Sequence, residues 1–158
     1  MAHRTILQSR GRGGPTYTAP SHRYFGKLAY PAVKEPTYGE VVDIVNSVGH
    51  SAPLMIVELA NQNMCLIPAP LGIKVGQRIS FGTKEIGAGS VAFLKDIPAG
   101  TMVCNIESSP GDRGKFLRSG GASAQIVGKE GDNVMIKMPS KKKKSFHPNC
   151  LATVGAVA

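Results

Sequence analysis

The chain of 158 residues lacks several features that mark common protein classes. It has no tryptophan and only 6% aromatic residues, so we expect small cores built from valine, isoleucine and leucine. No apolar run approaches the roughly 20 residues that a membrane span needs. The polar and basic N-terminus also has no apolar segment of the kind found in a signal peptide. We therefore expect a cytoplasmic protein, and neither a membrane protein nor a secreted one.

Motifs for catalysis and metal binding are also missing. The sequence has no G-x-x-x-x-G-K-[ST] loop, no G-x-G-x-x-G before an apolar helix and no paired carboxylates in a shared motif. Cys65, Cys104 and Cys150 lie far apart without C-x-x-C spacing, which indicates reduced, buried thiols and not disulfides or a zinc site. His50, in a loop, is expected to make a polar contact and not to act in catalysis. A small hydrolase or nucleotide-binding enzyme is thus disfavoured, and we expect no cofactor and no small-molecule substrate.

The formal charge of +9 is distributed unevenly. Residues 1–35 carry six Lys or Arg against one acid, residues 36–107 carry four against six, and residues 108–158 carry nine against three. A charge that served solubility alone would be interspersed along the chain. The basic segments on both sides of a nearly neutral part imply an anionic partner, which is a nucleic acid, a membrane surface or an acidic protein.

A glycine-rich stretch from Cys104 to Ala124 favours nucleic acid among these partners. Glycines allow backbone N–H groups to approach phosphate oxygens, and Arg113, Lys115 and Arg118 supply cationic donors beside them. Four consecutive lysines, Lys141 to Lys144, follow later in the chain. Taken alone they are compatible with a solvated turn, but beside the glycine-rich loop they favour phosphate contacts.

Residues 1–35 read as a basic arm that does not fold alone, because glycine and proline interrupt every apolar period. Aromatic residues alternate there with positive charges, as expected for a segment that threads along RNA. The alternative is a solvated tail with a few aromatics packed on the next domain, and Tyr30 and Pro31 are expected to pack in this way. We predict that the arm is disordered in the free protein and becomes ordered on RNA.

The remainder predicts a mainly β fold with two small barrels. Short β-branched runs separated by turns favour an oligonucleotide-binding (OB) barrel at residues 36–86 and an SH3-like barrel at 87–158, with 87–100 as the connection. The strands are expected at Gly39 to Val45, Leu54 to Ala60, Met64 to Pro68, Gln77 to Phe81, Thr101 to Glu107, Ala122 to Gly128, Asn133 to Met138 and Leu151 to Val157, with a hairpin turn at Gly131 to Asn133.

The order of several uncommon motifs resembles the universal large-subunit ribosomal protein two family over essentially the whole chain. The motifs are P-S-H-R-Y (Pro20 to Tyr24), S-A-P-L (Ser51 to Leu54), G-T-M-V-C-N-I-E (Gly100 to Glu107), P-G-D-R-G-K (Pro110 to Lys115), R-S-G-G-A-S-A (Arg118 to Ala124) and C-L-A-T-V-G (Cys150 to Gly155). The arm and the P-G-D-R-G-K form resemble the archaeal and eukaryotic branch, and the arm favours the archaeal side.

The resemblance implies a structural protein of the large ribosomal subunit. Its partners would be large-subunit ribosomal RNA and neighbouring ribosomal proteins, and it would support assembly of the peptidyl-transferase region and subunit association. Magnesium is expected only as a bridge to RNA phosphates. Taken together, residue types and resemblance give the candidate RNA contacts Arg4, Arg10, Arg12, His22, Arg23, Lys27, Gly111, Arg113, Lys115, Arg118, Ser119, Lys141, Lys142, Lys143 and Lys144.

The sequence departs from the family at its end. Family members continue beyond the residues that match Gly155 to Ala158 into a Gly-, His- and Arg-rich extension, and none of the four histidines here matches the family histidine near the catalytic centre. The alternative to a ribosomal protein is a non-ribosomal translation or transcription factor that binds RNA with tandem barrels.

Overall fold

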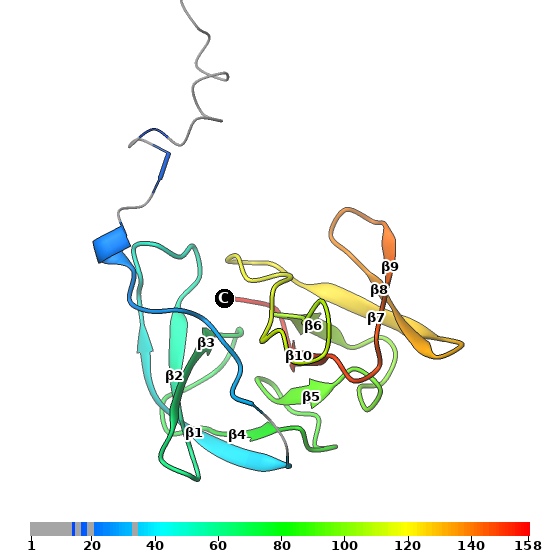
Figure 1. Cartoon of the computed structure of the whole chain (residues 1–158), viewed down its shortest axis with the longest axis horizontal. Helices are drawn as coiled ribbons and strands as arrows, with labels where there is room; N and C mark the ends of the chain where they lie inside the picture. The colour runs from blue at the N-terminus through cyan, green and yellow to red at the C-terminus, as the bar shows by residue number, and fades with distance from the viewer. Residues whose placement is uncertain (1–13, 15–16, 19–20, 33–34) are drawn as a thin grey trace, which may run out of the picture.

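The computed structural model describes residues 14, 17–18, 21–32 and 35–158. Ten strands form one sheet in the order β3-β2-β1-β4-β5-β10-β6-β7-β8-β9 (Figure 1). The helical element in this part of the chain is the 3-10 turn η1 (Ser21–Arg23). The strands are β1 (Thr37–Val45), β2 (Leu54–Leu59), β3 (Met64–Pro68), β4 (Arg78–Phe81), β5 (Val91–Phe93), β6 (Met102–Cys104), β7 (Ala124–Glu130), β8 (Asn133–Lys137), β9 (Lys143–Phe146) and β10 (Leu151–Val154).

Strands β1 to β4 surround one apolar core. β1 pairs antiparallel with β2 and β2 with β3, which makes an antiparallel meander, and β4 crosses over to pair antiparallel with the other side of β1. Along β2 the buried side chains Leu54, Met55, Val57 and Leu59 come close to the period of two expected of a half-buried strand. The core consists of Tyr30, Val41, Met55, Val57, Leu59, Ile67, Ala69, Ile79, Phe81, Val91 and Leu151.

Strands β5 to β10 surround a second core and join the first part of the sheet through one parallel register pair, Phe81 with Val91. β10 lies between β5 and β6, and β7, β8 and β9 continue the sheet in antiparallel order. The prediction of a mainly β chain is confirmed, and two cores are present, as two small barrels require. The boundary between residues 86 and 87 stays a prediction, because the sheet is continuous across it.

The strand predictions differ from the structure in several places, and the strand expected from Leu151 to Val157 ends at Val154. Val91–Phe93, expected inside a connection, is strand β5, and part of the lysine run forms strand β9. The strand expected from Thr101 to Glu107 ends at Cys104, because Asn105 adopts a left-handed backbone with φ of 47°. The expected alternation of faces also fails there, since Val103 to Glu107 are all buried.

The C-terminal part of the arm packs on the sheet, so the prediction of disorder is wrong for it. Leu28 and Tyr30 are 5% and 1% exposed, and the Ala29 N–H donates to the Leu66 carbonyl of β3. The Tyr30 hydroxyl donates to the Asn105 carbonyl at 2.7 Å and lies 2.6 Å from Thr153 Oγ1 of β10. Tyr30 therefore packs as expected and connects both parts of the sheet. Most of the arm before Ser21 lies outside the described residues.

The last four residues also lie between the two parts of the sheet, as the position of the C-terminus in Figure 1 shows. Pro70 and Val157 form a β-bridge, and the Ala158 N–H donates to the Ala69 carbonyl. On the other side, the Gly121 N–H donates to Val157. The C-terminal segment thus connects the end of β3 to the loop before β7.

Candidate nucleic-acid interface

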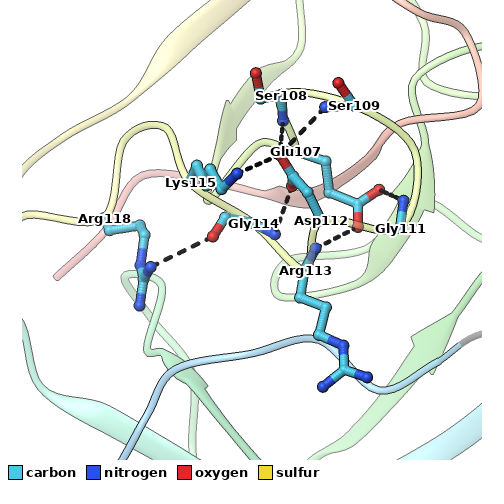
Figure 2. A network of polar contacts seen from close by, with 9 residues as sticks. All are labelled: Glu107, Ser108, Ser109, Gly111, Asp112, Arg113, Gly114, Lys115 and Arg118. Carbon is cyan, nitrogen blue, oxygen red and sulfur yellow. Dashed lines mark hydrogen bonds and ion pairs between the residues drawn. The ribbon is translucent and has the colours of Figure 1, made fainter.

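The loop that follows β6 folds around a buried carboxylate of its own, Glu107 (Figure 2). Glu107 is 1% exposed. Its Oε1 accepts the Arg113 N–H at 2.9 Å, and its Oε2 accepts the Leu151 N–H of β10 at 2.8 Å and the Gly111 N–H at 3.4 Å. Hydrogen bonds from N–H groups to a carboxylate are among the stronger ones, so Glu107 fixes the loop backbone and anchors it to β10.

Asp112 organises the other side of the loop. Its Oδ2 accepts the N–H groups of Ser108 and Ser109, and its Oδ1 accepts the Gly114 N–H at 3.2 Å. Burial alone would raise the pKa of Asp112, but the N–H donors and the Lys115 ammonium hold this pKa below its usual range. The carboxylate therefore stays ionised, and the negative charge holds the turn closed.

The direction of the loop N–H groups differs from the sequence interpretation. The sequence led us to expect that the glycine N–H groups would point toward phosphate. Instead, the N–H groups of Gly111 and Gly114 donate to the carboxylates of Glu107 and Asp112. Gly114 is needed for a second reason: a Cβ there would lie 2.5 Å from Asn105 Oδ1, a buried atom without a hydrogen-bond partner. The positive side chains, and not the glycine backbone, are left to face a polyanion.

The three cations of the loop have different surroundings. Arg113 is exposed, and Figure 2 shows its side chain extending away from Glu107 and Asp112. Lys115 is also exposed, and its Nζ lies 3.4 Å from Asp112 Oδ2. Arg118 is half-buried, and its guanidinium donates to the carbonyls of Gly114 and Leu28. Burial lowers the pKa of Arg118, although the proximity of Tyr30 raises it. Arg118 thus connects the loop to the arm.

The lysine run projects from the β8–β9 hairpin. Lys141, Lys142 and Lys143 are exposed, and Lys141 has a left-handed backbone with φ of 65° in the turn. Lys144 is held differently, because its Nζ lies 3.9 Å from the ring centroid of Phe116 in the loop. One lysine of the run, Lys144, therefore packs on an aromatic ring, and the phosphate contacts expected of the run stay a prediction.

The arm contributes a second group of candidate RNA contacts. His22, Arg23 and Lys27 are exposed, whereas Arg4, Arg10 and Arg12 lie outside the described residues. Tyr24 fixes this part of the arm by packing edge-on against His50, with 5.3 Å between ring centroids. His50 makes the polar contact expected of it, through Nδ1 and Ser47 Oγ at 2.9 Å. Burial, followed by the positive charge of Arg118, lowers the pKa of His50.

Ser119 and the following glycine lie where the loop meets the first part of the sheet. Ser119 is exposed, and its carbonyl accepts the Ala122 N–H. The Gly120 N–H donates to Ser51 Oγ, and a Cβ on Gly120 would lie 2.8 Å from the Ser51 carbonyl. This close approach explains the glycine here. Sequence reasoning missed Glu107 and Asp112 as organising residues, although two acids in an otherwise basic stretch were the available signal.

The described residues offer no group of three or more His, Cys, Asp or Glu side chains that could hold a metal ion. Glu107 is buried and N–H donors occupy both loop carboxylates, and magnesium as a bridge to RNA phosphates stays a prediction. The three cysteines are free thiols. Burial raises the pKa of Cys65 and Cys104 to about 12, which makes them poor nucleophiles.

Comparison with known proteins decides the family. The family described as Ribosomal Proteins L2, C-terminal domain, matches residues 87–158. The large ribosomal subunit protein uL2 of Methanococcoides burtonii is 44% identical over 161 residues, which cover 100% of this chain and 68% of the relative. The uL2 proteins of Archaeoglobus fulgidus and Saccharolobus islandicus are each 43% identical, over 100% of this chain and 68% and 67% of their own lengths. The chain belongs to the uL2 family.

The uL2 family consists of structural proteins of the ribosome and not of enzymes, and the relatives in archaea are components of the large subunit in the cytoplasm. The resemblance to the archaeal branch of uL2 is therefore confirmed. In the part of the chain that the structure describes, no helix is long and apolar enough to cross a membrane.

Proposed function

We propose that the chain binds large-subunit ribosomal RNA through three sources of positive charge. These are the arm, the loop after β6 and the tip of the β8–β9 hairpin. The observation that carries the proposal is the use of the loop's own carboxylates to hold its backbone, which leaves Arg113 exposed and directed away from them (Figure 2). Arginine in this arrangement presents a planar set of donors to phosphate oxygens.

The proposal assigns different roles to the predicted contacts. Arg113, Lys115 and Lys141 to Lys143 would contact phosphates, together with His22, Arg23 and Lys27 of the arm, because all are exposed. Phosphate contacts of this kind position a protein on RNA without reading sequence. Arg118 would hold the arm against the loop, since its guanidinium is already bonded to two carbonyls. The same RNA contacts would support assembly of the peptidyl-transferase region and association of the subunits.

The test is the salt dependence of binding to large-subunit ribosomal RNA. Each phosphate neutralised contributes a slope of about −0.9 on duplex and about −0.7 on single-stranded RNA in log K against log salt. Replacing Arg113 by Ala should weaken binding about fivefold at ~0.1 M salt and reduce the slope by about one contact. The matched control is Lys74→Ala, an exposed lysine in the loop before β4, which should change binding less than twofold.

Circular dichroism should show that both variants keep the β fold. Binding by the parent chain that hardly changes between low and moderate salt would contradict the electrostatic account. A loss of folded signal in Arg113→Ala would instead make the loop structural first. Retention on large subunits through a high-salt wash is expected of a resident ribosomal protein, whereas a soluble factor would be stripped.

A further inference from the structure

A cleft of about 530 Å³ lies beside the loop, between the arm, the end of β5 and the turn before β10. Its apolar walls come from four segments of the chain, and they include Pro31, Phe93 and Pro110. Its volume lies in the range of sites that accept small ligands or single groups of a larger one. A hydrophobic lining with a few polar groups is the usual composition of such a site.

Two cations border this cleft, Arg113 and Lys95. Lys95 follows β5, where its Nζ donates to Asn149 Oδ1 at 3.1 Å and lies 5.2 Å from the centroid of the Phe93 ring. The acid on the cleft wall, Glu107, is 1% exposed and accepts three backbone N–H groups. The accessible charge of the cleft is therefore positive, which suits an anionic group.

The polar groups also have complementary geometries. An ammonium such as that of Lys95 acts as a compact point charge, whereas the guanidinium of Arg113 presents a fork of donors. Asn149 lines the cleft, and because its oxygen accepts from Lys95, its amide N–H groups are not used by this bond. Phosphate, an apolar ring and a hydrogen-bonding edge occur together in a nucleotide.

We propose that this cleft holds one nucleotide of a single-stranded segment of ribosomal RNA. Its phosphate lies between Lys95 and Arg113, and its base packs against Phe93 and the two prolines. Proteins recognise unstacked RNA bases in this way, by packing them on apolar or aromatic side chains beside phosphate contacts. The inference rests on the proposed RNA-binding function and adds Lys95, which lies in the nearly neutral part of the sequence, to the residues that bind RNA.

The first experiment measures binding of Lys95→Ala to archaeal large-subunit ribosomal RNA over a range of salt. Loss of one single-strand phosphate contact should reduce the slope by about 0.7 and the affinity about fivefold at ~0.1 M salt. Lys95→Arg should restore most of both. Lys74→Ala removes the same charge away from the cleft and is expected to behave like the parent chain.

A second experiment uses the unmodified chain, so that it does not depend on how a variant folds. RNA that carries 4-thiouridine is crosslinked to the chain by light, and the attached peptides are identified by mass spectrometry. Crosslinks are expected on the peptides that contain Phe93 or Pro31. The cleft proposal is overturned, with RNA binding intact, if Lys95→Ala keeps the parent slope and crosslinks avoid these peptides. A parent chain that shows no salt-dependent binding overturns both proposals together.

Discussion

At the scale of single residues, Glu107 shows how an acid can serve a binding loop for a polyanion. In the described part of the chain the one ion pair joins Lys115 to Asp112, so Glu107 is stabilised by backbone N–H groups and not by a cation. A buried charge is tolerated only when hydrogen bonds replace its hydration. Because the charge is compensated by the backbone, the exposed Arg113 is left available for RNA.

Replacing Glu107 by Gln should loosen the loop without unfolding the chain. The amide keeps one acceptor oxygen, but its NH₂ group faces N–H donors that it cannot satisfy. The expected cost is about 1–3 kcal/mol in the free energy of unfolding. Chemical denaturation measures this loss, and hydrogen exchange should become faster at the amides of Gly111 and Arg113. Glu58→Gln, at an exposed position of β2, is the matched control. Equal stability of the two variants would contradict the role assigned to Glu107.

The environments of some of these side chains could be predicted from the sequence, and those of others could not. The exposure of Arg113 and Lys115 follows from residue type, and the burial of Tyr30 was also expected. The acceptors of the loop N–H groups were not predicted, because a glycine shows that a backbone can approach something and not what it approaches. The contact of Arg118 with the arm was not predicted for a similar reason: one of its partner carbonyls belongs to Leu28, 90 positions away.

At the scale of elements, hydrophobic patterning located the strands of the first core within about two residues, and Met64–Pro68 was predicted at its observed bounds. β9 was missed because its residues Lys143 and Lys144 resemble a solvated turn. What makes them a strand is pairing with β8, where Lys144 lies opposite Ile136. Phe146 lies two residues further on the same face and is buried. This pairing depends on the hairpin turn and on the face that β9 shares with β8, and the lysine residue type alone does not show it.

The β8–β9 hairpin should therefore contain lysines of two kinds. Lys144→Ala removes a cation from the face of Phe116, which should lower the free energy of unfolding by about 0.5–1 kcal/mol. Lys142→Ala should change stability by less than about 0.5 kcal/mol but reduce the salt slope of RNA binding. Denaturant titrations and binding isotherms on the same two variants separate the effects.

A double-mutant cycle between Lys144→Ala and Phe116→Leu tests whether the contact itself accounts for the stability change. The two substitutions should be non-additive, because each removes the same contact. Additive effects would show that Lys144 stabilises the hairpin in another way.

At the scale of the whole molecule, one continuous sheet covers two cores, and the charges gather at the arm, the loop and the hairpin. The contacts between the two cores include the register pair of Phe81 and Val91, the segment around Tyr30 and the last four residues. The total charge predicted the class of partner, since it needs no coordinates. The contacts of Tyr30 and of the last four residues could not be predicted, because they join residues that are remote in sequence.

Tyr30→Phe tests how tightly the two cores are connected. The substitution keeps the buried ring but removes the hydroxyl, which leaves the Asn105 carbonyl and Thr153 Oγ1 without this partner. We expect a loss of about 1–2 kcal/mol in the free energy of unfolding. Tyr38→Phe is the matched control, since Tyr38 is half-exposed on β1 and its ring contacts Arg78. If Tyr30→Phe were no less stable than Tyr38→Phe, the hydroxyl would not connect the cores.

The parent chain should unfold in a single transition, with hydrogen exchange in both cores reporting the same free energy. Separate transitions in the parent chain would show that the continuous sheet does not make them one folding unit.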